Sequence, residues 1–206
     1  MANVIKLRKG LDINLKGKAN FETIRRIDSS EIALVPDSFG GVTPKVIVRE
    51  GDCVKAGDAL FVDKKYPEMK FASPISGTVK AVVRGDRRKV LYVKVKADET
   101  QQFVDFGIKD IEKLDGEAIK EALLASGLFS FIQQLPYAVT TTPDTMPKAI
   151  FVSAFRDMPL ASDFEVELKG NEKDFQTGLT ALSKIQKTYL GLSVHQTASA
   201  LVNAKD

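Results

Sequence analysis

Short apolar runs separated by turn residues dominate the first hundred residues, and this spacing constrains the fold more than any other sequence feature. Val4, Ile5 and Leu7 begin a first strand, and Leu11, Ile13 and Leu15 alternate with polar residues at period two. A β-branched run covers 45–48, and two further runs at 77–83 and 90–95 bracket a short loop. Such alternation and β-branched residues are typical of half-buried strands. No helical stretch interrupts them. We therefore predict a compact all-β module over residues 1–107.

The character of the chain changes near residue 108, where helical spacing replaces strand alternation. Asp115 can cap a helix over 117–125 whose apolar residues share one face. A second short helix is expected over 128–135, because Pro136 would end it. Residues 108–145 are therefore predicted to form a helical linker.

The last part of the chain has a strand–helix–strand–helix pattern. Continuous apolar runs at 149–155 and 189–194 are typical of buried parallel strands. Residues 171–185 between them have helical spacing, and 197–204 also read as a helix. This order is the opening of a doubly wound, Rossmann-like sheet. Two strands do not make a stable sheet of that kind, so we expect residues 146–206 to be the truncated beginning of an α/β domain. The predicted fold class of the whole chain is α+β.

The most informative motif is the pattern G-D-x-V-x-x-G-x-x-L at Gly51–Leu60. Its two glycine turns let a strand fold sharply back, while Val54 and Leu60 fill the core between them. Pro74–Val79 follows with a proline–glycine corner that enters another strand. This combination resembles the biotinyl/lipoyl fold, the barrel-sandwich hybrid, and implies that fold for the N-terminal module.

A carrier function is the alternative that this fold suggests. Lys70, within Glu68–Phe71, resembles the lysine that carries biotin in such proteins, which lies at an exposed hairpin tip. Lys70 is closer to Pro74 than a carrier lysine would be, so we expect it to lie in a strand. A freestanding biotinyl- or lipoyl-like carrier, or a small-ligand-binding module, remains the alternative function.

A longer pattern is more specific. It consists of D-K-K-Y-P at Asp63–Pro67, K-F-x-S-P-x-S-G-x-V at Lys70–Val79 and R-G-x-x-R-x-x-L at Arg84–Leu91. The pattern closely resembles the NqrA family of the sodium-translocating NADH:quinone reductase. Glu68 departs from it, since the family commonly has glycine after the proline. Other stretches extend the resemblance over essentially the whole chain: Lys9–Asp12, Ser126–Leu128, Ala149–Val152 and Pro159–Ala161.

The resemblance implies a peripheral subunit of a complex that couples electron transfer from NADH to quinone with Na⁺ export. It places the chain on the cytoplasmic side of the bacterial inner membrane, held by other subunits, with a link to quinone. The chain would thus be part of an enzyme as a scaffold and interaction subunit without an active site of its own. NADH, flavins, iron–sulfur centres and quinone would belong to the complex. Family members are longer, so we expect this chain to be an N-terminal part.

Composition excludes several other functions. Thirty Lys and Arg residues against 27 Asp and Glu give a net charge of only +3, which provides no electrostatic footprint for nucleic acid. Cys53 and His195 are the only residues of their kinds, too few for a cluster or zinc site. The N-terminus lacks the apolar segment of a signal peptide, and the run at 149–155 is too short to span a bilayer. No catalytic, cofactor-binding or metal-binding residue is assigned.

Related flavin-bearing subunits carry a glycine-rich FMN loop in the link before the Rossmann-like domain. Glycine there lets backbone N–H groups approach a phosphate. The corresponding stretch here, Gly127–Pro136, has the bulky residues Phe129 and Phe131 instead. We therefore predict that the nucleotide site is lost while the scaffold is kept.

The loop Arg84–Lys89 carries four basic residues and one acidic residue. A charged loop between two strands is commonly a solvated hairpin tip. Arg84 and Arg88 also belong to the family pattern, which favours a docking patch. Both interpretations remain open at this point.

Overall fold

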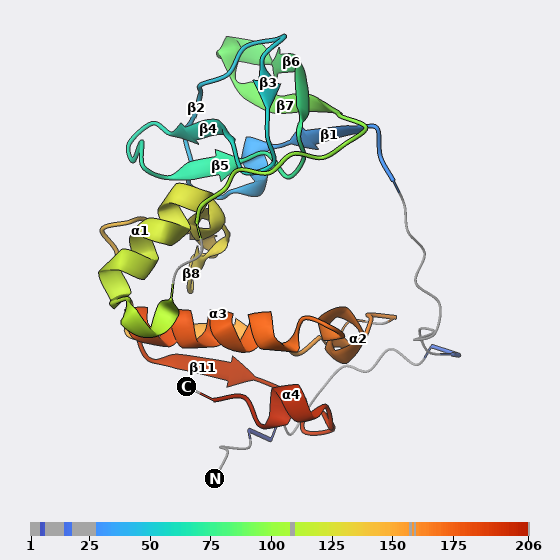
Figure 1. Ribbon diagram of the computed structural model, residues 1–206, viewed down its shortest axis with the longest axis vertical. Helices are drawn as coiled ribbons and strands as arrows, with labels where there is room; N and C mark the ends of the chain where they lie inside the picture. Colours follow the sequence, from blue (N-terminus) through green and yellow to red (C-terminus); the bar gives the residue numbers. More distant parts are fainter. Residues whose placement is uncertain are drawn as a thin grey trace. The chain divides into compact units, whose positions relative to one another are not determined.

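The computed structural model describes residues 5–6, 15–17, 28–107, 110–156, 158 and 160–205. The chain divides into two compact units (Figure 1). The first is Ile27–Met146, and the second contains Pro147–Asp206. The strand predicted from Val4 to Leu15 lies mostly outside the described residues.

Two antiparallel sheets form most of the first unit. The larger sheet has the strand order β1–β7–β6–β3, and the smaller has the order β2–β4–β5. Side chains from both sheets share one core, in which Leu60, Phe61 and Val93 are completely buried. This arrangement agrees with the predicted all-β module. The strands are β1 (Glu31–Leu34), β2 (Pro44–Val46), β3 (Cys53–Val54), β4 (Ala59–Asp63), β5 (Lys70–Ala72), β6 (Gly77–Arg84) and β7 (Val90–Ala97).

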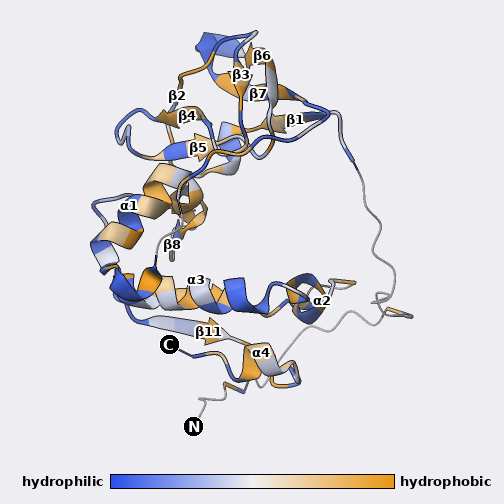
Figure 2. Cartoon of the chain, viewed as in Figure 1, coloured by the Kyte–Doolittle hydropathy of each residue, from blue (hydrophilic) through white to orange (hydrophobic). Residues whose placement is uncertain are grey.

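The β6–β7 hairpin is the longest paired element of the first unit. Its strands are antiparallel with two register shifts and are joined by a 3₁₀ turn, η2 (Asp86–Arg88). Figure 2 shows hydrophilic residues gathered at this tip. At the other end, a Cβ atom on Gly77 would lie 1.9 Å from the carbonyl oxygen of Lys96. The glycine of the predicted proline–glycine corner is therefore required by close backbone approach.

The helical link packs on the first unit. α1 (Gly116–Ser126) begins at the predicted cap, where Asp115 Oδ1 accepts a hydrogen bond of 2.8 Å from the backbone N–H of Ala118. The helix contacts β5. The link thus lies in the same compact unit as the sheets, while the domain boundaries at 107 and 145 remain predictions.

The helix predicted over 128–135 is wrong beyond its first turn. A 3₁₀ turn, η4 (Leu128–Phe131), is followed by a small hairpin of β8 (Gln133–Gln134) and β9 (Val139–Thr140). The backbone N–H of Thr141 donates to the Ile132 carbonyl at 2.9 Å, which continues this pairing. Aromatic and β-branched residues have low helix propensity, so cross-strand pairing prevails here.

The second unit contains the expected strand–helix–strand element. β10 (Ile150–Ser153) and β11 (Thr188–Gly191) pair in parallel, and α3 (Glu172–Ile185) connects them. A short helix, α2 (Phe164–Leu168), precedes α3 and was missed from the sequence. α4 (Ser199–Val202) is shorter than the helix predicted over 197–204.

Within the described residues, the β10–β11 sheet is covered on one face only. Phe151 is 71% exposed and Tyr189 is 44% exposed, and their rings stack with centroids 5.4 Å apart. The prediction of doubly buried strands is therefore wrong for this face, although the parallel pairing is confirmed. The opposite face is half-buried, and α3 contacts β11.

Strands and helices together give the chain the expected α+β class.

Candidate functional site

The single cysteine and the single histidine are both exposed, Cys53 in β3 and His195 after β11. They belong to different units. Among the residues that the structure describes, no group of three or more His, Cys, Asp or Glu side chains is placed to hold a metal ion.

Lys70 opens β5 and pairs with Val62 of β4. The residues at the tip of this hairpin are 64–69, and Lys70 is half-buried beside them. The prediction that this lysine lies in a strand is confirmed. A carrier needs its lysine at an exposed tip, so this position does not support a carrier function.

The D-K-K-Y-P motif builds that hairpin tip around a buried carboxylate. Asp63 is 5% exposed and accepts three backbone hydrogen bonds, from Thr43 at 2.8 Å, Lys65 at 2.7 Å and Tyr66 at 3.0 Å. The Tyr66 hydroxyl then donates to Asp144 at 2.7 Å. Hydrogen bonds from Thr142 and from Tyr66 hold the pKa of the Asp144 carboxyl below its ordinary value. These contacts fix the end of the link to the β4–β5 hairpin, so the motif has a structural role.

The link at Gly127–Phe131, where the sequence predicts a lost flavin loop, is held by packing. Gly127 ends α1 with a φ of +79°. A Cβ atom there would lie 3.0 Å from the Ala72 Cβ, so glycine allows α1 to approach β5 closely. Phe129 fills the core of the first unit and is 7% exposed. The glycine and the aromatic residue therefore both serve the contact between the link and the sheets.

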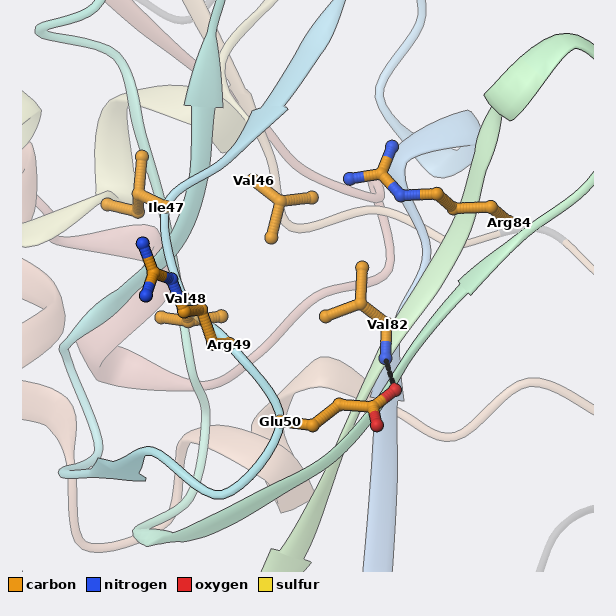
Figure 3. A pocket seen from close by; sticks show the side chains of 7 residues that line it. All are labelled: Val46, Ile47, Val48, Arg49, Glu50, Val82 and Arg84. Atoms are coloured by element: carbon orange, nitrogen blue, oxygen red, sulfur yellow. Dashed lines mark hydrogen bonds between the residues drawn. The ribbon is translucent and has the colours of Figure 1, made fainter.

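A groove of about 400 Å³ lies between one edge of each sheet (Figure 3). One wall is the segment 46–50, which begins in β2, the edge strand of the smaller sheet. The other wall is the end of β6. In Figure 3, Val46 and Val82 lie on opposite sides of the groove, and Arg84 extends from β6 toward Val46. The lining residues are Val46, Ile47, Val48, Arg49, Glu50, Val82 and Arg84.

The β6 wall of this groove is an open strand edge. β3 pairs with β6 at Gly77 and Thr78, and the backbone N–H of Gly51 donates to the Val79 carbonyl oxygen at 2.9 Å. Beyond that point the backbone N–H of Val82 donates to Glu50 Oε1 at 3.2 Å. A side-chain carboxylate thus occupies a place that a neighbouring strand would take.

The predicted basic loop lies at the end of the same wall. Arg84 Nη1 donates to the Arg88 carbonyl at 3.2 Å, and Lys89 forms an ion pair with Asp37 at 2.6 Å. Lys89 is therefore partly neutralised. Of the basic loop, Arg84 lines the groove. The sequence singled out the loop but missed the apolar wall at 46–48, which carries no charged or turn-forming signal.

Comparison with known proteins assigns the family. The family model of the NqrA N-terminal barrel-sandwich hybrid domain matches residues 5–98, and that of the NqrA second alpha/beta domain matches residues 114–206. The chain belongs to the NqrA family. The barrel-sandwich and α/β assignments predicted from the sequence are thereby confirmed.

Curated NqrA proteins align with most of the chain. The NqrA subunit of the Na(+)-translocating NADH-quinone reductase of Histophilus somni (strain 2336) is 36% identical over 191 residues, which are 92% of this chain and 43% of that protein. Its namesakes from Yersinia pestis and from Actinobacillus pleuropneumoniae serotype 5b (strain L20) are each 36% identical, and their alignments cover 88% of this chain and 41% of theirs. The chain thus spans about two fifths of the length of these relatives.

The family models and the structure assign the helical link to different domains. The second-domain match begins at residue 114 and includes α1, whereas α1 packs against β5 of the first unit. A segment assigned by sequence to the second domain therefore contacts the barrel-sandwich module.

Proposed function

We propose that this chain forms part of the NqrA subunit of a sodium-translocating NADH:quinone reductase, a complex that couples electron transfer from NADH to quinone with Na⁺ export. The observation that carries the proposal is the match to two consecutive NqrA domains, which together cover most of the chain. The name shared by its curated relatives supports the same function.

Within that complex the chain acts as scaffold and interaction surface, linked to quinone, and has no active site of its own. The packing of Phe129 into the core of the first unit supports this role, because a flavin loop would need glycine in this link. NADH, the flavins, iron–sulfur centres and quinone belong to the complex.

The chain is peripheral, on the cytoplasmic side of the inner membrane, and is held there by other subunits. No helix in the described ranges has the length and apolar character needed to cross a bilayer. The open groove on the first unit offers a surface for such a subunit.

Deletion and complementation in the source bacterium test the proposed function. Deleting the gene should abolish Na⁺-dependent quinone reduction by NADH and Na⁺ uptake into inverted membrane vesicles, and the full-length gene should restore both. Affinity purification of the tagged protein should recover the membrane subunits. Wild-type Na⁺ uptake in the deletion strain would contradict the proposal.

The absence of a flavin site is tested on the isolated chain. The purified protein should be colourless and should show no saturable binding of FMN or NADH at micromolar concentration, since aromatic packing fills the link around Phe129. A flavin-binding relative with a glycine-rich loop is the positive control. Saturable FMN binding would place a cofactor site in this chain after all.

A further inference from the structure

We propose that the groove between residues 46–50 and β6 binds an extended acidic segment of another subunit, which pairs with the open edge of β6. The inference rests on the proposed function in one respect, that the segment comes from a partner in the same complex. The groove itself is a feature of the first unit alone.

The backbone of β6 supplies the first argument. Past Val79, no other strand pairs with this side of β6 among the described residues. The Val82 N–H instead takes the Glu50 carboxylate as its acceptor, at 3.2 Å. Glu50 is exposed and can swing away at little cost. An added strand would then supply carbonyl acceptors, as in other cases of strand addition to a sheet edge.

The apolar lining supplies the second argument. Val46, Val48 and Val82 are half-buried because they also pack against the core of the first unit, and Ile47 is 51% exposed. β2 pairs only with β4, so the opposite wall of the groove also begins at a strand edge. A strand places alternate side chains on opposite sides. An extended segment in the groove would therefore turn every second side chain toward the valines.

The charges determine what kind of segment fits. Arg49 and Arg84 are exposed, and neither guanidinium lies within ion-pair distance of a carboxylate in the described part of the chain. Glu50, the one acidic side chain of the lining, already accepts the Val82 N–H. Arginine binds carboxylates through two parallel hydrogen bonds. Acidic residues in the incoming strand would pair with the two arginines, whereas lipid headgroups would leave the strand edge unpaired.

Site-specific photo-crosslinking in the assembled complex tests this inference. A photoreactive phenylalanine analogue at Ile47 should crosslink to another subunit, and mass spectrometry should map the crosslink to an extended segment rich in Asp and Glu. The same analogue at Phe103, which is 70% exposed in the same unit and outside the groove, is the control. A crosslink from Ile47 to a helical or basic segment would overturn the inference.

Charge reversal tests the arginines. Arg49→Glu with Arg84→Glu should lower the Ile47 crosslink at least about tenfold, because like charges then face each other across the contact. Lys55→Glu with Lys64→Glu makes the same change in net charge at exposed sites outside the groove and should leave the crosslink unchanged. Both variants should melt at nearly the wild-type temperature, since exposed substitutions of this kind have small effects on stability.

The remaining outcomes separate this inference from the proposed function. If the protein co-purifies with the complex but Ile47 gives no crosslink, or if charge reversal has no effect on the crosslink, the groove inference fails and the function stands. If the protein does not co-purify at all, the proposed function fails and this inference fails with it. Binding of the isolated chain to anionic vesicles that is lost on reversing the two arginines would assign the groove to lipid instead. Glu50→Gln keeps an acceptor, removes one negative charge and should strengthen the crosslink.

Discussion

Substitution of Gly77 by alanine tests how the β6–β7 hairpin is closed. The new methyl group would lie 1.9 Å from the Lys96 carbonyl oxygen, and real Cβ contacts are essentially never shorter than 3.0 Å. The two backbones therefore have to separate by about 1 Å. The clash is with backbone, so no side chain can move away to relieve it. We expect Gly77→Ala to destabilise the first unit strongly.

The size of the effect follows from the contacts that this movement opens. Gly77 pairs with Ala97, and beside this pair the Asp98 N–H donates to the Ser76 carbonyl at 3.0 Å. Loss of two or three backbone hydrogen bonds costs about 1 kcal/mol each. Strain from overpacking adds about 1–3 kcal/mol. The expected loss of unfolding free energy is thus about 3–6 kcal/mol.

Hydrogen exchange measures this loss separately in each unit. Peptides from β6 and β7 should exchange much faster in Gly77→Ala than in the wild type, while peptides from α3 should be unchanged. Gly178→Ala is the matched control, because Gly178 lies in α3 with nothing within 4 Å of the added methyl. It should stabilise the helix by about 0.5–1 kcal/mol. A change of less than about 1 kcal/mol in Gly77→Ala would refute the reasoning about close approach.

Three further substitutions test other parts of the fold. Asp63→Ala leaves three backbone N–H groups without their acceptor and should cost about 2–4 kcal/mol in urea unfolding; a cost below about 1 kcal/mol would show that water replaces the carboxylate. Hydrogen bonds from Lys80 and Lys94 hold the pKa of Glu31 below its ordinary value. The ionised carboxylate therefore stabilises the folded state above the unfolded-state pKa, and this contribution is lost as the pH falls through the folded-state pKa. Glu31→Gln should therefore weaken the acid dependence of the melting temperature, and an unchanged profile would exclude Glu31 as a source. Phe151→Ser removes an exposed aromatic ring, so it should leave stability within about 1 kcal/mol and reduce self-association in sedimentation experiments; unchanged sedimentation would show that this face does not associate.

Local signals in the sequence were sufficient for much of the first unit. The Asp115 cap, the β6–β7 hairpin and the strand position of Lys70 depend on residues that are near one another in the chain. The motif at Gly51–Leu60 and the corner at Pro74–Val79 added the barrel-sandwich fold, which periodicity alone could not select among all-β folds. Gly77 was recognised as a corner, but its contact with Lys96 is visible only once the strands are paired.

Features that depend on distant residues were predicted less well. The groove joins Glu50 to Val82, which are 32 residues apart, so no local pattern could reveal it. The run 149–155 was predicted to be buried on both faces, because an apolar run does not say whether a second layer is present. Phe151 on the open face shows that this layer is missing from the described structure.

The parallel pairing of β10 and β11 also has a consequence for the order of folding. The β6–β7 hairpin closes over residues 85–89, so its first hydrogen bonds need only a short loop. The β10–β11 pair forms only after residues 154–187 have been arranged between the strands, with α3 among them. Folding slows as contacts become more distant in sequence. During synthesis, the first unit should therefore acquire its native pairing before the second, and nascent chains that stall past residue 146 should already present a finished groove.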